Sequence, residues 1–478
     1  MTLILKCFSH ILRRLPVRCA LAPEKSYAYN LVLFLHYNDY VKRGFVMKVK
    51  VLTLGCKVNQ FESQAMLREL SENGYEIVGE DDAADVSVIN SCAVTKASEQ
   101  KAVKMIHRLR RENPSSVIVL TGCMAQAFPE CGNELPEVDI VLGNKRRSDL
   151  IPVLNGYLAG QTKLTMVEGY GKNDPYESLF VDDFLNRTRA YLKIEDGCNR
   201  FCSYCIIPYA RGRVRSCSLD YIRKEIAAFA GNGYREVVII GINLSSYGSD
   251  NGLTFSDAVS AACESADIRI RLGSLEPEAM DIGTLKKLSG YKNFCPQFHL
   301  ALQSGCNETL RRMNRHYTTE EYEEIVCNIR SVFDNPSVTT DVMVGFPGET
   351  EEEFRRSMEF VRKIGFARVH IFPYSRRAGT VADRAPGQIS PEVKKERAAL
   401  MAQAAKQGMS EFLASQIGRT ESVLIETLNK DGFYEGYTMN YTHVHVRSEE
   451  NISGLVVPVR IISAKDESCF GELISADL

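Results

Sequence analysis

Three cysteines within eight residues constrain this chain more than any other feature. They lie in the stretch Cys198-Asn-Arg-Phe-Cys202-Ser-Tyr-Cys205, separated by three and then two residues. Three thiolates on so short a loop reach three corners of an iron–sulfur cube, whereas a structural zinc site takes four ligands. One iron is then left without a protein ligand, so that a small molecule can bind it. A disulfide framework and buried structural thiols are the alternative interpretations.

Length and composition indicate a globular chain of several domains. A chain of 478 residues is too long for one hydrophobic core and suggests about three domains. Its 15 cysteines are scattered along a long chain, which is typical of reduced thiols and metal ligands in the cytosol. The net charge of −2 means that any nucleic-acid binding depends on local basic patches. No stretch reaches the roughly 18 apolar residues that cross a membrane, so we predict no membrane contact.

A second group of cysteines follows three predicted strands in residues 47–160. Apolar runs at residues 49–54, 86–90 and 117–121 predict strands, and helical patterns at 62–73 and 98–112 lie between them. This alternation favours an open parallel α/β sheet. Ligands of such sheets gather at the carboxyl ends of the strands, so we expect the cysteines after the three strands to converge. Three unrelated buried thiols are the alternative interpretation. The cysteines are Cys56, Cys92 and Cys123.

Residues 184–415 alternate strands and helices again. Six strands are predicted at residues 191–194, 237–240, 268–272, 298–302, 340–344 and 368–372, fewer than a closed eight-stranded barrel contains. Ser218 predicts a helix start, and Thr318 with Glu321 and Thr350 with Glu353 form capping boxes. Polar residues stand at the carboxyl ends of the strands, where the active sites of such barrels lie. They are Asn243, Ser274, Glu276, Gln303, Ser304 and Asp341.

The last part of the chain has a different character. Ser390-Pro391 predicts the start of a long helix that runs to about residue 416. Five short strands follow, which suggests a small barrel; they are expected at residues 423–426, 432–438, 441–447, 455–462 and 472–474. Residues 416–478 hold five Lys or Arg against ten Asp or Glu, a charge that does not favour phosphate binding. Any nucleic-acid binding by this part would then rely on aromatic residues such as Tyr434, Tyr437 and Tyr441, or on contacts with the bases of a folded loop.

Four motifs together resemble the radical S-adenosylmethionine (SAM) methylthiotransferase family: DGCNRFCSYCIIPYARG, TLGCKVNQFES, NSCAVT and TGCMAQ. The resemblance implies that Cys198, Cys202 and Cys205 are catalytic and hold a 4Fe–4S cluster whose open iron binds SAM. It also implies a second 4Fe–4S cluster on the three cysteines after the N-terminal strands. The six polar strand-end residues resemble family segments that line the SAM or substrate site. The last domain resembles the TRAM domain, an RNA-binding module.

Three stretches are most similar to one branch of that family: GCKVNQFES, SCAVT and LQSGCNETLRRMNRHYTTEEY. This branch places a methylthio group on C2 of N6-threonylcarbamoyladenosine, just 3′ of the anticodon of tRNA. We expect the same reaction here, in a cytoplasmic monomer that uses a tRNA anticodon stem-loop, a low-potential electron donor and a sulfur source. Branches that act on isopentenyladenosine or on a ribosomal protein remain as alternatives, and so does a non-catalytic iron–sulfur protein.

The predicted organisation is therefore α/β with a small all-β barrel at the end. Residues 47–160 form the N-terminal methylthiotransferase domain with an open parallel sheet, and residues 161–183 form a linker. Residues 184–415 form a partial (β/α)6 radical SAM barrel, and residues 416–478 form the TRAM barrel. Residues 1–46 are expected to be a disordered extension, or to precede a true start at Met47.

Overall fold

The computed structural model describes residues 46–160, 162–181 and 188–474. Among the described residues, 46, 152–160 and 162 belong to one compact unit, while 47–151, 163–181 and 188–474 belong to a second. The contacts discussed below all lie within the second unit. The predicted extension, apart from residue 46, lies outside the described residues.

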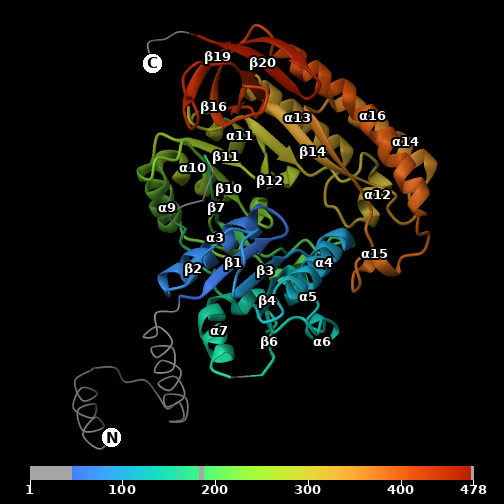
Figure 1. Ribbon diagram of the computed structural model, residues 1–478. Coiled ribbons are helices and arrows are strands. Elements are labelled where there is room, and N and C mark those ends of the chain that lie inside the picture. The colour runs from blue at the N-terminus through green and yellow to red at the C-terminus, as the bar shows by residue number, and fades with distance from the viewer. Residues whose placement is uncertain (1–45, 161, 182–187, 475–478) are drawn as a thin grey trace, which may run out of the picture. The chain divides into compact units, whose positions relative to one another are not determined.

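The second unit begins with a six-stranded sheet in the order β2-β1-β3-β4-β5-β6, in which every pair is parallel (Figure 1). Its central strands β3 and β4 are buried along their whole length, as expected of parallel strands that are covered on both faces. The predicted open parallel sheet is confirmed. The strands are β1 (Lys48–Thr53), β2 (Glu76–Ile77), β3 (Val86–Ser91), β4 (Val117–Gly122), β5 (Ile140–Leu142) and β6 (Leu164–Met166).

Several helices of this part begin at or shortly after a cysteine. Helix α3 (Lys57–Glu72) starts directly after Cys56, five residues before the predicted start, because Val58 and Phe61 are buried and extend its apolar side. The Thr95 side chain caps α4 (Lys96–Glu112) by accepting a hydrogen bond from the backbone N of Ser98. The remaining helices are α5 (Cys123–Ala127), α6 (Cys131–Glu134), the 3-10 helix η2 (Asn144–Asp149) and α7 (Leu150–Leu158).

The middle of the chain forms two parallel sheets, ordered β7-β10-β11 and β12-β13-β14-β15. An isolated bridge joins Ile270 of β11 to Phe294, which precedes β13. The strands follow each other in chain order, with helices between them except at β11 and β12, which Gly273 separates. The predicted partial barrel is confirmed. Its strands are β7 (Arg189–Lys193), β10 (Glu236–Ile240), β11 (Arg269–Leu272), β12 (Ser274–Leu275), β13 (Gln297–Leu300), β14 (Ser337–Val344) and β15 (Arg368–Pro373); β8 (Glu195–Asp196) and β9 (Arg215–Ser216) form a separate antiparallel pair.

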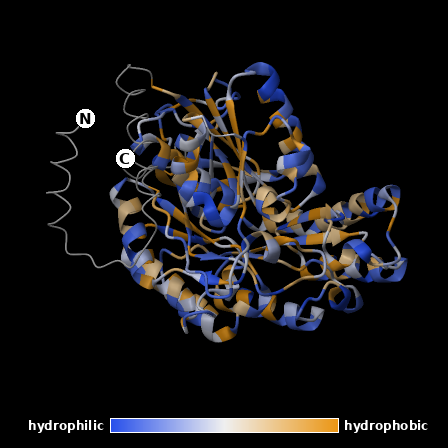
Figure 2. Ribbon diagram, turned by 90° about the horizontal axis from the view of Figure 1, so that it is seen from below, coloured by the Kyte–Doolittle hydropathy of each residue, from blue (hydrophilic) through white to orange (hydrophobic). Residues whose placement is uncertain are grey.

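The helix starts of this barrel follow the predicted capping signals. Ser218 caps α9, and both capping boxes, Thr318 with Glu321 and Thr350 with Glu353, are formed. In Figure 2 hydrophilic and hydrophobic residues alternate along many helices, as expected of helices with one buried side. The helices are α8 (Ile207–Arg211), α9 (Leu219–Gly231), η3 (Leu244–Ser246), α10 (Phe255–Ser265), η4 (Pro277–Ala279), α11 (Ile282–Ser289), α12 (Asn307–Arg312), α13 (Thr319–Val332), α14 (Glu351–Ile364) and α15 (Val381–Arg384).

The last described part of the chain forms a closed five-stranded barrel (Figure 1), so the prediction of a small barrel is confirmed. Helix α16 (Pro391–Ser415) precedes it and is capped by Ser390. Alternate residues of the strands point inward, so that Tyr434 belongs to the barrel core and is not the RNA-facing aromatic residue that we predicted. The strands are β16 (Thr420–Leu428), β17 (Tyr434–Thr438), β18 (His443–Val446), β19 (Val456–Lys465) and β20 (Ser468–Leu473).

The segment predicted as a linker is packed in its described part. Residues Leu164–Met166 pair with β5 as the edge strand of the first sheet. The Tyr176 hydroxyl donates to the Lys193 carbonyl oxygen, and the Arg215 guanidinium lies 4.6 Å from the Tyr170 ring centroid. Aromatic side chains therefore give this segment contacts that its Gly, Asn, Asp and Pro content did not reveal.

Within the part of the chain that the structure describes, no helix combines the length and the apolar character needed to span a membrane.

Candidate active site

The loop after β7 and β8 brings Cys198, Cys202 and Cys205 together. The backbone N of Cys198 donates to the Gly212 carbonyl at 3.0 Å, and that of Cys205 donates to the Cys202 carbonyl at 2.9 Å. Gly197 has a φ of +87°, and a Cβ there would lie 2.0 Å from the Arg213 carbonyl oxygen, so only glycine fits. The close spacing in sequence thus becomes a compact group of thiols at the carboxyl end of a barrel strand.

The surroundings of these thiols fit a metal cluster. Burial, with a smaller contribution from the neighbouring Cys202, raises the pKa of Cys198 to about 11 and that of Cys205 to about 12. A cationic metal centre offsets this cost because it binds the thiolate form. The Nδ2 of Asn243 lies 3.6 Å from the Cys198 sulfur, and the Nη1 of Arg315 lies 3.4 Å from the Cys202 sulfur. Three thiols with polar donors beside them suit a 4Fe–4S cluster with one open iron.

Two of the predicted SAM contacts lie beside this group. Asn243 also has a buried side-chain oxygen, Oδ1, without a hydrogen-bond partner. Its backbone N donates to Glu195 at 2.8 Å, and burial raises the pKa of that carboxyl well above its usual range. Glu276 pairs with Arg315, whose Nη1 lies 3.0 Å from Oε1 of the carboxylate. Asn243 directly, and Glu276 through Arg315, therefore adjoin the sulfur atoms.

Of the other four predicted contacts, two line a cavity, Gln303 is half-buried and Ser304 is buried. Ser274 and Asp341 line the cavity described below. Gln303 has a φ of +63°, and its backbone N donates to the Asp341 carbonyl at 2.8 Å. Ser304 is buried, and its hydroxyl accepts a hydrogen bond from the backbone N of Cys306 at 3.3 Å. This hydrogen bond stabilises the turn between Ser304 and Cys306.

The structure also brings Cys56, Cys92 and Cys123 together, although they are far apart in sequence. They follow β1, β3 and β4, whose carboxyl ends meet at one edge of the sheet. A Cβ on Gly55 would lie 3.2 Å from Cβ of Cys92, and one on Gly122, at φ +92°, would lie 2.4 Å from the Ser91 carbonyl oxygen. The convergence thus depends on glycines that let neighbouring strand ends approach each other.

Polar donors reach this second group of thiols as well. The Nε of Arg211 donates to the Cys123 sulfur at 3.2 Å, and the backbone N of Val94 donates to the Cys92 sulfur at 3.4 Å. Burial raises the pKa of Cys123 to about 11 against the opposing charge of Arg211, and burial also raises the pKa of Cys92. These donors and the three thiols fit a second iron–sulfur cluster by the same argument as the first.

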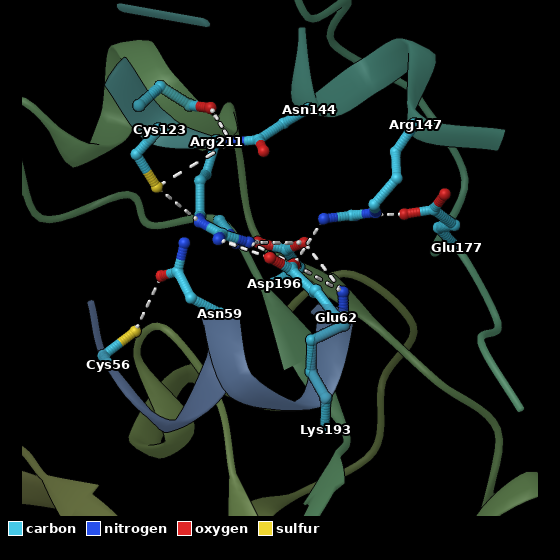
Figure 3. Close-up of polar contacts among 12 residues, drawn as sticks. Cys56, Asn59, Glu62, Cys123, Asn144, Arg147, Glu177, Lys193, Asp196 and Arg211 are labelled. Carbon is cyan, nitrogen blue, oxygen red and sulfur yellow. Dashed lines mark hydrogen bonds and ion pairs between the residues drawn. The ribbon is translucent and has the colours of Figure 1, made fainter. Parts of the chain in front are cut away.

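A buried network of charges ties this sheet to the barrel (Figure 3). Arg211 donates to both carboxylate oxygens of Glu62 at 2.6 and 2.8 Å, and to Asp196 at 3.2 Å. Lys193 lies 3.3 Å from Glu62 and 3.1 Å from Asp196, and Arg147 lies 2.9 Å from Glu62. The side chains of Glu62, Lys193 and Arg211 are fully buried. One guanidinium therefore connects α3, the loop of the first thiol group and Cys123 of the second.

A cavity of about 730 Å³ opens beside Cys56. It extends past the strands of the partial barrel to the outer wall of the C-terminal barrel, where Tyr437 and Tyr441 stack with ring centroids 4.4 Å apart. Its lining carries several cations: Lys57, Arg189, Arg271 and Arg368. One cavity is thus lined both by Cys56 of the second thiol group and by aromatic residues of the last domain.

The cations of this cavity differ in their partners. Arg189 contacts Glu426 at 2.5 Å, and Arg271 binds both oxygens of Glu236 at 2.6 and 2.9 Å. No described carboxylate forms an ion pair with Lys57. Desolvation, followed by the charges of Arg189 and Arg271, lowers the pKa of Lys57 to about 8. Lys57 is thus a cation whose counter-ion would have to enter the cavity.

A histidine pair stands on the barrel side of the cavity. The Nε2 of His299 lies 3.3 Å from Asp341, and the His299 and His370 rings are 5.6 Å apart. Burial and the neighbouring His299 lower the pKa of His370. Sequence reasoning missed these histidines, and it also missed Arg211 and Lys57. Arg211 and Lys57 lie inside the quoted motifs, which were the available signal.

Comparison with known proteins adds independent findings. Residues 48–143 match the uncharacterized protein family UPF0004, and residues 192–361 match the radical SAM superfamily. The chain is 37% identical over 385 residues to a protein of Aquifex aeolicus named threonylcarbamoyladenosine tRNA methylthiotransferase MtaB, covering 80% of this chain and 94% of that one. The protein of the same name from Bacillus subtilis is 36% identical over 419 residues, covering 86% of this chain and 93% of that one.

Relatives with another named substrate are similar at nearly the same level. A tRNA-2-methylthio-N(6)-dimethylallyladenosine synthase of Pelotomaculum thermopropionicum is 35% identical over 431 residues, covering 87% of this chain and 96% of that one. Among solved structures, the radical SAM methyltransferase TsrM of Kitasatospora setae matches with a TM-score of 0.53 at 12% identity, covering 71% of this chain and 77% of that one. That match shows a shared fold alone.

Proposed function

Because this chain belongs to the radical SAM methylthiotransferase family, we propose that it inserts a methylthio group at C2 of N6-threonylcarbamoyladenosine, 3′ of the anticodon in tRNA. The proposed ligands of one 4Fe–4S cluster are Cys198, Cys202 and Cys205, and those of a second are Cys56, Cys92 and Cys123. When bound, the clusters and SAM supply one-electron chemistry. The C2–H bond of adenosine requires such chemistry because its hydrogen is neither acidic nor a leaving group, so that acid–base catalysis cannot activate it.

The observation that carries this proposal is the close packing of the two thiol groups. Ile206 and Ala210, from the segment after Cys205, pack against Ala93 and Cys123 in one apolar cluster. Arg211 then donates to the Cys123 sulfur. These contacts join the segment after the first thiol group to a cysteine of the second. A reaction that needs both clusters at one substrate atom requires such an arrangement.

The free cation in the cavity favours a substrate that carries a carboxylate. The threonyl part of N6-threonylcarbamoyladenosine ends in a carboxylate, whereas a dimethylallyl group is apolar. Lys57 adjoins Cys56 and has no described carboxylate partner, so its ammonium is available to the substrate. Stacked Tyr437 and Tyr441, on the far wall, provide a surface for an extruded base.

Replacing Lys57 with methionine is expected to lower kcat/KM for tRNA that carries threonylcarbamoyladenosine by about 10- to 100-fold, the usual worth of a charge-assisted hydrogen bond. Nucleoside mass spectrometry of in vitro reactions measures this effect. The matched control is Lys48→Met, which removes an exposed lysine 4.0 Å from Glu76 and should change little. Equal losses in both variants would contradict a role for Lys57 in substrate recognition.

Replacing Cys92 with alanine is expected to leave SAM cleavage intact and to stop methylthio insertion, because only the second cluster loses a ligand. Iron content should fall by about four atoms per chain, the size of one cluster. Chromatography of 5′-deoxyadenosine and of tRNA nucleosides separates the two activities. Insertion at the normal yield would refute the proposed role of this cysteine group.

The decisive experiment compares tRNA nucleosides from cells with and without this gene. The proposal predicts loss of 2-methylthio-N6-threonylcarbamoyladenosine and accumulation of its unthiolated precursor. Loss of the corresponding dimethylallyladenosine derivative would instead assign the other tRNA substrate. An unchanged nucleoside profile would direct attention to ribosomal proteins.

The proposal requires further partners. These are the tRNA anticodon stem-loop, a low-potential electron donor and a source of sulfur, and we propose that the enzyme acts as a monomer in the cytoplasm. The excess of acidic residues in residues 416–478 suggests that stacking contributes more than phosphate contacts to RNA binding by the last barrel.

A further inference from the structure

The outer wall of the C-terminal barrel carries a group of side chains that the reaction above does not use. We propose that Glu435, His443 and His445 form a binding site for one divalent zinc ion, separate from the six cluster cysteines. The site has three protein ligands, so a fourth position remains for water or another external oxygen ligand.

Strand register brings the three side chains together. In the antiparallel pair of β17 and β18, Glu435 lies opposite His445, and Tyr437 lies opposite His443. Residues two apart on a strand and their cross-strand partners share one face of a sheet. The alternate residues Val444 and Val446 are buried in the barrel core, so Glu435, His443 and His445 lie on the outer face.

The donor atoms are already close to the distances of a zinc site. The Nδ1 of His445 lies 3.4 Å from one oxygen of Glu435, and the Nε2 of His443 lies 3.8 Å from the other. One donor atom from each residue lies within 4.8 Å of the others. Zinc–ligand bonds of about 2.0–2.1 Å in a tetrahedron place neighbouring donor atoms about 3.3 Å apart. Small rotations of the side chains are therefore sufficient to close the site.

Outer contacts orient two of the three ligands. The Nδ1 of His443 lies 2.8 Å from the Ser468 hydroxyl, which leaves Nε2 directed at the group. The Nδ2 of Asn429 donates to Glu435 at 2.7 Å. Metal-binding histidines and carboxylates usually have such partners, which fix the donor atom that faces the metal.

The third ligand, His445, has a potential metal-binding nitrogen without a hydrogen-bond partner. The Nδ1 of His445 is buried and has no hydrogen-bond partner, although it faces the carboxylate. The His445 ring stacks on Phe470 at a centroid distance of 4.8 Å, and its packing restricts rotation toward another partner. Buried polar atoms are normally satisfied, and a bound cation would satisfy this one. Two imidazoles and one carboxylate are a donor set that zinc accepts readily.

The experiment counts metal ions on the full-length protein with both clusters loaded. After equilibration at buffered micromolar free zinc, mass spectrometry of the metals should find about one zinc per chain without loss of iron. His443→Ala and Glu435→Gln should each lose this zinc and keep the iron, and Ser468→Ala should bind it about 10-fold more weakly. The matched control is His107→Ala, which removes a single exposed His–Glu pair and should keep the zinc.

X-ray absorption at the zinc edge identifies the ligands. Nitrogen and oxygen neighbours alone would support the site, and sulfur neighbours would overturn it because the zinc would then sit on cluster cysteines. The proposal is also overturned if the wild-type protein takes up no zinc, or if His443→Ala and Glu435→Gln retain it. Unchanged iron content and an unchanged unfolding midpoint show that a variant has folded, and Ser468→Ala tests the site without removing a ligand.

Discussion

Replacing Cys202 with alanine is expected to abolish the reductive cleavage of SAM. The rate of SAM cleavage should fall by more than the roughly 100-fold loss that follows from replacing a residue hydrogen-bonded to a metal ligand, because here a ligand itself is removed. Cys202 lies between two other thiols on a loop of eight residues, and the Nη1 of Arg315 reaches its sulfur at 3.4 Å. Release of 5′-deoxyadenosine by the chemically reduced protein measures the effect.

A matched cysteine distinguishes this role from general damage by the substitution. Cys327 is exposed and lies on α13, outside both thiol groups, so Cys327→Ala should keep SAM cleavage and iron content. Cys202→Ala should lose about four iron atoms per chain while the second cluster remains. Substantial SAM cleavage by Cys202→Ala would contradict the assignment of this loop to the SAM-binding cluster.

Replacing Arg211 with methionine is expected to lower the free energy of unfolding by about 3–5 kcal/mol, the usual result of removing one partner of a buried ion pair. Glu62 and Asp196 would lose a buried counter-charge, and Cys123 would lose its donor at 3.2 Å. Urea unfolding followed by circular dichroism measures the change. The control Arg223→Met removes an exposed pair with Asp220 and should stay within about 0.5 kcal/mol of the wild type.

The same network gives the wild type a specific dependence of stability on pH. Burial raises the pKa of Glu62, but the charges of Arg147, Arg211 and Lys193 outweigh it and lower the pKa to about 2. A carboxylate with a lowered pKa in the folded state stabilises the fold above its unfolded pKa, and this contribution is lost as the pH falls toward 2. Arg211→Met should lose less stability than the wild type between about pH 4.5 and pH 2. Equal acid sensitivity in both proteins would show that Arg211 does not hold Glu62 ionised.

Local patterns in the sequence determined much of this protein. Apolar runs specified the central strands, capping residues such as Thr318 and Thr350 specified helix starts, and short cysteine spacing specified the first thiol group. Chain order alone implied that Cys56, Cys92 and Cys123 meet, because the carboxyl ends of parallel strands share one edge. Each of these predictions depends on interactions between neighbours in sequence or on a general rule of sheet topology.

Tertiary structure decided which polar and aromatic side chains have partners. Arg211 reaches Glu62 across 149 positions of the chain, and no local pattern encodes that pairing. The edge strand Leu164–Met166 depends on an available neighbour in the sheet, and Tyr434 turns inward because strand register places it in the barrel core. The same register gathers Glu435, His443 and His445 on the outside. Sequence therefore specified the local elements and the cysteine motifs, whereas packing between distant segments set the charges and the surfaces around them.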